Sequence, residues 1–442
     1  MYLYLSTHSQ INGLLSNAKV SPMGRIVREN GVKMSYRSTC SIRSRGLIKH
    51  KILVHCRCFW LNFVRIANSV AGIILILFLL SIFLCSCSKR NNSVSTIMLN
   101  DIEFNISFLN KLKSDTVTIP LSRLVDGCEL VHLEYSEEAL FKPDITTVTD
   151  NYIGVSQELG DYKLFSRSGK FLCSIGSIGQ GPGEYIAVND CIIDDNNGLV
   201  YLAPIFSDKI YVYNTSGRFL RNIEIPQFFI YAIPYLSDDI LTIVYIPITE
   251  DKSIAIKINI HTGQILNEFT TQIPQPERGG FASSRNIKNI FDLSHALSDT
   301  IYHFDIQNNS IRPIFTTSDN FSNEVTKRHV QINKNLVLTA IRSKGVLIAT
   351  DMKNKRSSFI KVKNDFFGNI DLPISIYFYL NGYFTYNVQP EQLMEDIKQH
   401  LSDSNCTEKD RQMLKKTLST LKEGENNVVF IGKLKNEVEN LF

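Results

Sequence analysis

The sequence predicts an all-β protein of the β-propeller class, and three observations lead to this prediction. A hairpin at Lys163–Ile175 recurs at Ile210–Ile223, and both copies read aromatic residue, Ser-Gly, basic residue, Phe-Leu and Ile. Four glycines and a proline crowd Gly176–Gly183, which excludes a strand or helix and indicates a shaped loop between two sheets. Short apolar runs separated by turn residues fill the rest of the body. A repeat of roughly 40–50 residues built from short strands is typical of a propeller blade.

Strand signals follow one another along the body, each an apolar run bounded by Gly, Asn, Asp, Ser or Pro. Outside the two hairpins, the expected strands are Val117–Ile119, Leu130–His132, Ile145–Thr149, Tyr152–Val155, Asp190–Asp194, Val200–Leu202, Ile223–Ile225, Phe228–Ala232, Ile240–Ile246, Ile254–Ile260, Ile265–Phe269, Asn289–Leu293, Thr300–Asp305, Ile311–Phe315, Val330–Ile332, Leu336–Arg342, Val346–Asp351, Ser358–Val362, Ile374–Asn387 and Val428–Leu434. The acidic turn at Asp194–Gly198 lacks the spacing of a calcium loop, so we interpret it as a plain β-turn.

One region near the C-terminus predicts helices. Pro390–Gln399 carries apolar residues four apart, and Thr407–Asp410 resembles an N-cap before a second amphipathic run that Gly424 ends. The apolar positions are Leu393, Ile397, Leu401, Leu414, Leu418 and Leu421. We expect a small helical insertion over residues 390–424 whose apolar stripes pack on the side of the propeller. The alternative is that these stripes bind a partner.

Residues 1–69 form a basic N-terminal extension. They hold eleven Lys and Arg residues and one acid, Glu29, whereas the remainder of the chain carries 36 basic and 42 acidic residues. The extension fits a cytoplasmic tail, a start placed too early, or a long n-region ahead of an export signal. The body is mildly acidic and has no basic stripe with interleaved aromatic residues, which argues against a nucleic-acid partner.

Residues 70–87 are an uncharged apolar run that we interpret as a lipoprotein signal. Leu84–Cys87 resembles a lipobox, because a leucine stands three residues before Cys87 with small residues between them. Cleavage of such a signal needs small side chains beside the scissile bond and a thiol that carries diacylglycerol. We therefore expect lipidation at Cys87, followed by a linker over residues 88–115. The alternative is an uncleaved signal anchor with the basic tail inside the cell.

The nine cysteines form no recognisable framework. In the body they are single and widely spaced, without a CxxC pair, so buried free thiols are expected, although Cys173 and Cys191 could meet on adjacent strands. Cys56 and Cys58 lack two further ligands at zinc spacing. The sequence therefore predicts no metal site and no cofactor.

Four motifs of this chain resemble the six-bladed β-propeller lipoproteins of Bacteroides-type bacteria, which are related to NHL-repeat propellers. They are G-Q-G-P-G-E-Y at Gly179–Tyr185, the two S-G-K/R-F-L hairpins, S-D-T-I-Y at Ser298–Tyr302, and V-V-F-I-G-K-L-K at Val428–Lys435. The resemblance implies a six-bladed propeller over residues 116–437. It also implies that the protein is a lipid-anchored protein of the cell envelope. No acid follows Cys87 in Ser88–Asn91, which favours a periplasm-facing position at the outer membrane. Val117–Ile119 and Val428–Leu434 are the strands expected to close the ring.

Candidate binding residues are few, and sequence signatures of common enzymes are absent. Gln180, Glu184 and Tyr185 place polar and aromatic groups in the Gly-rich loop, which could hold a sugar or peptide or serve only as a corner between blades. The other candidates are polar residues near later strands, Arg285, Asp299 and His303. None of the six is assigned a catalytic role.

We therefore expect a membrane-anchored binding or scaffold module, with a carbohydrate, peptide or envelope-protein partner. A propeller-type lyase or hydrolase acting on carbohydrate is one alternative, and it would need two or more convergent titratable residues at the channel. A membrane-tethered sensor with a cytoplasmic basic tail is the other, and cleavage at Cys87 would exclude it.

Overall fold

The computed structural model describes residues 93–99, 102–157, 160–247, 252–274, 281–288, 290–295, 299–318, 327–438 and 441, together with two paired strands, β1 (Lys19–Val20) and β2 (Ile26–Val27). The chain divides into two units, residues 1–91 and 92–442, and all other sheets belong to the second. The expected lipoprotein signal over 70–87, with Cys87, lies outside the described residues, as does most of the basic extension 1–69. Among the described residues, no helix is long and apolar enough to cross a membrane.

Consecutive antiparallel strands make up the first sheets of the second unit. A four-stranded sheet contains β7 (Pro143–Val148), β8 (Tyr152–Gln157), β9 (Tyr162–Ser166) and β10 (Phe171–Ile175). A seven-stranded sheet contains β13 (Val188–Asp194), β14 (Leu199–Pro204), β15 (Ser207–Asn214), β16 (Phe219–Ser237), β17 (Ile240–Pro247), β18 (Lys252–Asn259) and β19 (Ile265–Pro274). Between the two sheets, the Gly-rich loop holds the short parallel pair β11 (Ser177–Ile178) and β12 (Glu184–Tyr185).

The remaining sheets combine strands from the start and the end of the unit. One contains β20 (Phe281–Ser284), β21 (Ile290–His295), β22 (Thr300–Asp305), β23 (Ser310–Ser318), β4 (Ile102–Phe108) and β3 (Val94–Leu99). The next contains β24 (Arg328–Asn333), β25 (Leu336–Ile341), β26 (Val346–Asp351), β27 (Arg356–Asn364), β28 (Ile370–Asp371) and β5 (Thr116–Pro120). The last contains β29 (Tyr379–Leu380), β30 (Tyr383–Val388), β31 (Val428–Lys433) and β6 (Glu129–His132).

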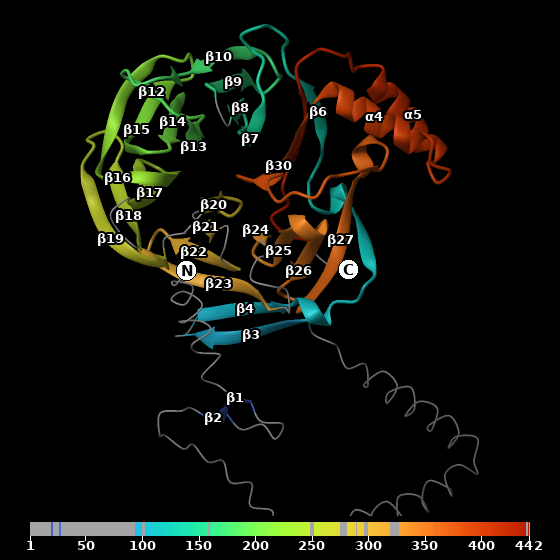
Figure 1. Cartoon of the computed structure of the whole chain (residues 1–442), viewed down its shortest axis with the longest axis horizontal. Helices are drawn as coiled ribbons and strands as arrows, with labels where there is room; N and C mark the ends of the chain where they lie inside the picture. Colours follow the sequence, from blue (N-terminus) through green and yellow to red (C-terminus); the bar gives the residue numbers. More distant parts are fainter. Residues whose placement is uncertain are drawn as a thin grey trace, which may run out of the picture. The chain divides into compact units, whose positions relative to one another are not determined.

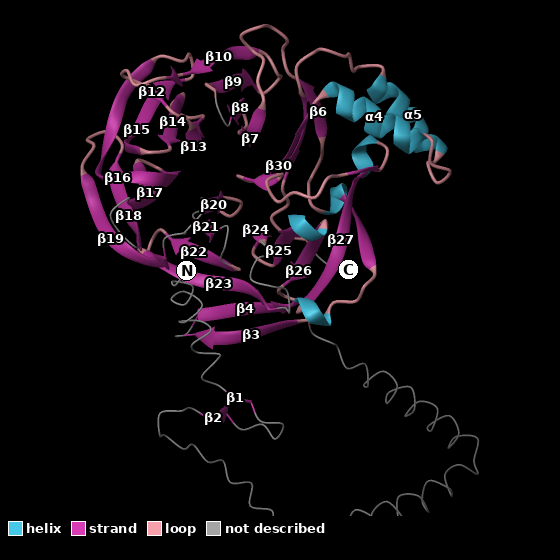
Figure 2. Ribbon diagram, in the orientation of Figure 1, coloured by secondary structure: helices cyan, strands magenta, loops and turns pink. Residues whose placement is uncertain are grey.

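These sheets stand side by side around a common centre in a propeller-like arrangement (Figure 1). The labels of β20 and β24 lie towards the centre of the view, whereas β10, β19 and β3 lie at the rim. Strands dominate the regular structure, and the only α-helices of the described residues lie together at one side (Figure 2). The predicted all-β propeller class is confirmed.

Two of the middle strands, β17 and β25, are mostly apolar and buried along almost their whole length because both of their faces are covered. Every residue of β25 is buried, and so are all residues of β17 after Ile240. A continuous apolar run of this kind is expected where one sheet packs against a neighbour on each side. The core consequently lies between the sheets, as radial packing requires.

Strand β16 joins two meanders into one sheet. Its first part pairs with β15, as in Ile210 with Ile223, and its second part pairs with β17, as in Tyr235 with Thr242. The sequence predicts two strands here, Ile223–Ile225 and Phe228–Ala232. The structure instead continues through Pro226 without a turn, so the described sheets do not divide into six separate four-stranded units.

The N-terminal part of the unit differs from the prediction. Residues 88–115 were expected to be a linker, but 94–99 and 102–108 form β3 and β4, because Phe104 and Ile106 bury against the sheet that β4 joins in parallel with β23. The predicted ring-closing strand at Val117–Ile119 lies in β5 and pairs with β27. β6 takes the expected place beside β31.

The predicted helices are present as α4 (Pro390–Leu401) and α5 (Glu408–Leu418). Thr407 is the N-cap of α5, and its hydroxyl oxygen accepts a hydrogen bond from the Asp410 backbone at 3.1 Å. The expected apolar stripe packs inward, with Leu393, Ile397 and Leu414 buried in the same core cluster as β24–β31. The prediction that the insertion packs on the propeller is confirmed. Short 3-10 turns occur at Leu109–Lys111, Leu121–Arg123, Arg342–Lys344 and Asp365–Phe367.

Candidate functional site

The Gly-rich loop between β10 and β13 is held by its own side chains. Glu184 accepts a hydrogen bond at Oε2 from the backbone N–H of Gly181, at 2.7 Å. Gly183 has φ of +76°, in the left-handed region, and its carbonyl oxygen accepts a hydrogen bond from the Tyr213 hydroxyl. Gln180, within the same loop, is exposed. These hydrogen bonds fix the conformation of the loop, and Gln180 faces solvent. We refer to the segment Gly176–Tyr185 as the braced corner.

Tyr185 fastens this corner to the preceding sheet. Its hydroxyl donates to the Ile175 carbonyl at 2.6 Å and accepts from the Tyr162 backbone N–H at 2.8 Å. The side chain is 2% exposed, and burial raises the pKa of the phenol well above its usual value. Tyr185 therefore remains neutral, and the protein itself supplies partners for both hydrogen-bonding roles of its hydroxyl.

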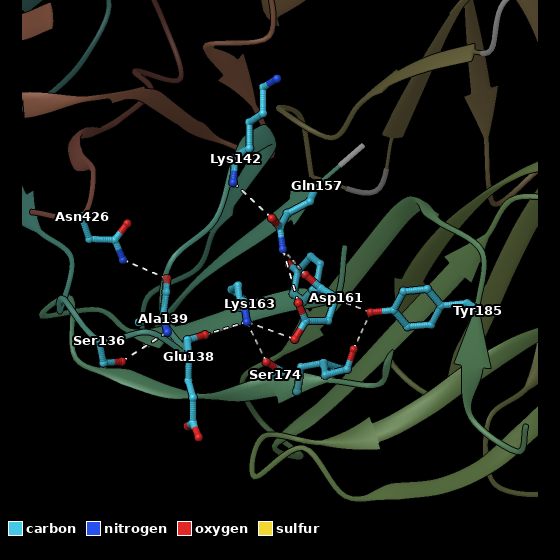
Figure 3. Close-up of polar contacts among 12 residues, drawn as sticks. Ser136, Glu138, Ala139, Lys142, Gln157, Asp161, Lys163, Ser174, Tyr185 and Asn426 are labelled. Carbon is cyan, nitrogen blue, oxygen red and sulfur yellow. Dashed lines mark hydrogen bonds and ion pairs between the residues drawn. The ribbon is translucent and has the colours of Figure 1, made fainter. Parts of the chain in front are cut away.

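Lys163 is a buried cation that sequence reasoning did not single out. Its Nζ donates to the Glu138 carbonyl at 2.6 Å and to Ser174 Oγ at 3.1 Å, and pairs with Asp161 Oδ2 at 3.0 Å (Figure 3). All three ammonium protons thus have acceptors. The cluster ties the segment before β7 to β9 and β10. A lysine within the otherwise apolar strand 162–165 is the signal that would have identified it.

Arg285 joins strands that are distant in sequence. Its Nη2 lies 2.5 Å from Asp190 Oδ2 on β13 and donates to the Pro234 carbonyl of β16 at 2.6 Å. Its Nη1 donates to Asn381 Oδ1 in the β29–β30 turn at 3.1 Å, and Ser283 donates to the same Asp190 oxygen at 3.0 Å. The carboxylate of Asp190 balances the charge of the guanidinium, and the Arg285 side chain is 12% exposed. Arg285 therefore links three sheets.

Asp299 and His303 have different partners: Asp299, just before β22, pairs with Lys327, just before β24 of the next sheet, whereas His303 on β22 contacts Asp292 on β21 of its own sheet. Asp299 Oδ2 lies 2.5 Å from Lys327 Nζ. His303 Nδ1 lies 2.9 Å from Asp292 Oδ1, and both of these side chains are buried. Burial raises the pKa of Asp292, while the hydrogen bond from His303 opposes that rise.

A small cavity is lined by residues of the β20–β23 sheet, of β24, and of β29 with the segment before it. Its volume of about 10 Å³ is bounded by Ser283, Ser284, Asp292, Ser294, Ile301, His329, Val330, Gln331, Ile376 and Leu380. Two buried atoms of this lining, Nε2 of His329 and Oε1 of Gln331, have no hydrogen-bond partner in the described protein. Burial lowers the pKa of His329 to about 3, so its ring is neutral near pH 7.

The six predicted binding residues thus occupy several places. Gln180, Glu184 and Tyr185 share the Gly-rich loop, whereas Arg285, Asp299 and His303 each contact a different titratable side chain. Sequence reasoning missed those partners, which are Asp190, Lys327 and Asp292, and the cavity residues His329 and Gln331. In the described part of the chain, no group of three or more His, Cys, Asp or Glu side chains is placed to hold a metal ion.

Comparison with known proteins identifies the family. A family model described as a domain of unknown function, DUF4934, matches residues 103–433. The chain belongs to the DUF4934 family. No curated protein matches this DUF4934 chain.

Two solved structures from Bacteroides are similar to the DUF4934 protein. A protein described as exported, from Bacteroides fragilis, aligns with a TM-score of 0.54 at 15% identity, covering 75% of this chain and 99% of its own. A member of the DUF4221 family from Bacteroides vulgatus aligns with a TM-score of 0.41 at 13% identity, covering 79% and 100%. The first likeness supports the propeller-like fold.

The braced corner of the DUF4934 protein yields a first prediction. Glu184→Ala removes the acceptor for the Gly181 N–H, so the melting temperature should fall by several degrees at most, measured by differential scanning calorimetry. Gln180→Ala is the matched control, since Gln180 is exposed, and should melt like the wild type. If Glu184→Ala also melts like the wild type but loses a partner, the corner is a binding site and its structural role is refuted.

Proposed function

We propose that this protein is a lipid-anchored, six-bladed β-propeller that acts as a binding or scaffold module in the cell envelope. The strand order supports six blades as follows. The seven-stranded sheet can be divided within β16 into two four-stranded meanders, β13–β16 and β16–β19. Each of the four remaining large sheets contains one further four-stranded set, with β3, β4, β5 and β28 as additions at the edges. An experimental map with fewer or more than six radial four-stranded sets would contradict this count.

The proposed localisation is the periplasm-facing side of the outer membrane. The lipobox-like Leu84–Cys87 supports it, and so does the fold shared with a protein described as exported. If Cys87 carries the lipid anchor, Cys87→Ala should leave a larger, unlipidated precursor, because the thiol that accepts diacylglycerol is gone. Mass spectrometry of the membrane fraction measures this. An intact wild-type peptide spanning Ser81–Lys89 would contradict the proposal and favour the tethered sensor.

Binding is favoured over catalysis by one observation: the candidate charged residues are already engaged inside the fold. Asp190 and Arg285 pair with each other, Asp292 pairs with His303, and Glu184 accepts from its own loop. The braced corner, in contrast, exposes Gln180 and also Ile178, whose side chain is 50% exposed. A rigid, uncharged surface of this kind suits a carbohydrate, peptide or envelope-protein partner better than general acid–base chemistry.

A crosslinking experiment tests the binding surface. A photoreactive amino acid at position 180 should capture a partner in intact cells, whereas the same residue at Lys415, an exposed position on α5, should not. Equal capture from both positions, or none from position 180, would contradict the corner as a binding surface.

A further inference from the structure

Three large apolar side chains beside the braced corner protrude into solvent. Ile186, Phe206 and Phe228 are 52%, 49% and 47% exposed. No Asp, Glu, Lys or Arg occurs in the segments around them, which are 185–189, 203–207 and 225–237. Large apolar side chains that gather on a surface leave much apolar area in water, so such a group is typical of an interaction surface.

The three side chains come from segments that are paired with one another. The backbone N–H of Ile205 donates to the Ala187 carbonyl at 3.0 Å, and Ser207 of β15 pairs with Phe229 of β16. Each of the three side chains is the immediate neighbour in sequence of one of these paired residues. The strands β12, β14, β15 and β16, which flank or carry them, lie together at one side of the arrangement (Figure 1). We refer to Ile186, Phe206 and Phe228 as the apolar patch.

Phe206 occupies its place in the apolar patch at a conformational cost. Its φ of +51° lies in the left-handed region, which a bulky residue rarely adopts. Its N–H donates to the Ile230 carbonyl at 3.2 Å, which fixes the turn between β14 and β15. Gly or Asn would adopt this φ more easily, so the stability of the turn does not account for a phenylalanine. Backbone strain of this kind is often found at binding sites.

The chain enters the propeller-like unit at the end of the sheets that bears the apolar patch. The first part of β16 and β23 are each the fourth strand of a consecutive meander, and repetition of such a meander around a ring points both strands to the same end. β4 runs parallel to β23, and β3 is antiparallel to β4, with Val94 opposite Ser107. β3 therefore begins at the end where the first part of β16 reaches Phe228.

We propose that the apolar patch contacts the phospholipid surface of the membrane that carries the chain. The proposal rests on the lipid anchor at Cys87 that is proposed above. Cys87 and Val94 are seven residues apart in sequence, a length of chain that spans at most about 25 Å, so this end of the unit stays within reach of the bilayer. Phe and Ile side chains gain free energy by entering the lipid interface, and an uncharged patch requires no anionic headgroups. The same lack of charge leaves little with which to recognise a soluble protein partner.

Photocrosslinking of the full chain in phosphatidylcholine vesicles tests this contact. A photoreactive amino acid at position 206 should form an adduct with the mass of one phospholipid, at low and high salt alike, because apolar contacts are not screened. Ser216, exposed in the turn at the other end of β15, is the matched control position and should form none. Three results would each overturn the proposal: no lipid adduct at position 206, equal adducts at both positions, or an adduct that requires phosphatidylglycerol and disappears in high salt.

The variant Phe206→Asn separates membrane contact from folding. Asn tolerates positive φ, so the melting temperature should stay the same or rise. Lipid capture from a photoreactive residue at position 186 should fall several-fold in this variant, because the aromatic ring is lost. Unchanged lipid capture, or a lower melting temperature that shows the ring to support the fold, would overturn the proposal.

Two further readouts in intact cells keep this proposal distinct from the proposed function. Protein capture at position 180 reports on the partner of the braced corner, and the mass of the N-terminal peptide reports on the anchor at Cys87. Failure of either readout contradicts only the proposed function, because the lipid adduct at position 206 is measured directly. A protein adduct at position 206 in place of a lipid adduct would overturn the membrane contact.

Discussion

Replacing Gly183 with alanine should destabilise the protein by about 3 kcal/mol. The residue has φ of +76°, where a side chain costs about 1 kcal/mol. A Cβ there would also lie 2.8 Å from two carbons of the Phe219 ring, and relieving such an overlap typically costs about 1–3 kcal/mol. Denaturant unfolding followed by circular dichroism measures the change. The Phe219 ring packs edge-on against Tyr213, so it has limited freedom to move away.

Gly263→Ala is the matched control for this prediction. Gly263 has φ of +70°, but a Cβ there would meet nothing within 4 Å. Its substitution should therefore lower the free energy of unfolding only through backbone strain at positive φ, by about 1 kcal/mol. If the two variants lose equal stability, the contact with Phe219 contributes nothing and the corner is less tightly packed than the structure indicates.

Replacing Leu414 with aspartate should lower the free energy of unfolding by about 4 kcal/mol. Leu414 is fully buried where α5 packs on Gly368 and the core beside β30 and β31. The change removes a large apolar side chain and places a carboxylate inside a cluster of buried apolar residues. Equilibrium unfolding in urea measures the loss. Met413→Asp is the control, since Met413 is exposed on the same helix and should change stability by less than about 0.5 kcal/mol. Unchanged stability of Leu414→Asp with loss of a binding partner would show that the stripe is an interface.

The sequence was most informative where local patterns determine structure. The helices α4 and α5 follow from apolar residues four apart and an N-cap at Thr407, and both are contained in a short segment. The hairpins around Gly169 and Gly217 follow from turn chemistry in the same way, and both glycines have positive φ. Such features depend only on neighbours along the chain.

Features set by distant partners were not predictable from one sequence. Apolar alternation at Phe104 and Ile106 was visible, but nothing local shows that β4 would pair with β23. The same holds for the site, because Arg285 meets an aspartate 95 positions away. Pairing at such separation depends on how the sheets are placed around the centre. A residue type alone cannot indicate it.

The pairing of β6 with β31 also determines when the fold can be completed. Glu129 lies opposite Ile431, so the fourth strand of this sheet is made well before its neighbour, which follows β30 and both helices in the chain. During synthesis, β6 has no partner until β31 has been made, and bringing such distant segments together is entropically slow. A nascent chain therefore carries β6 unpaired for most of its synthesis, and one edge of β30 stays unpaired until β31 is made. Chains released before Val428 would keep those edges exposed and become prone to aggregation or proteolysis.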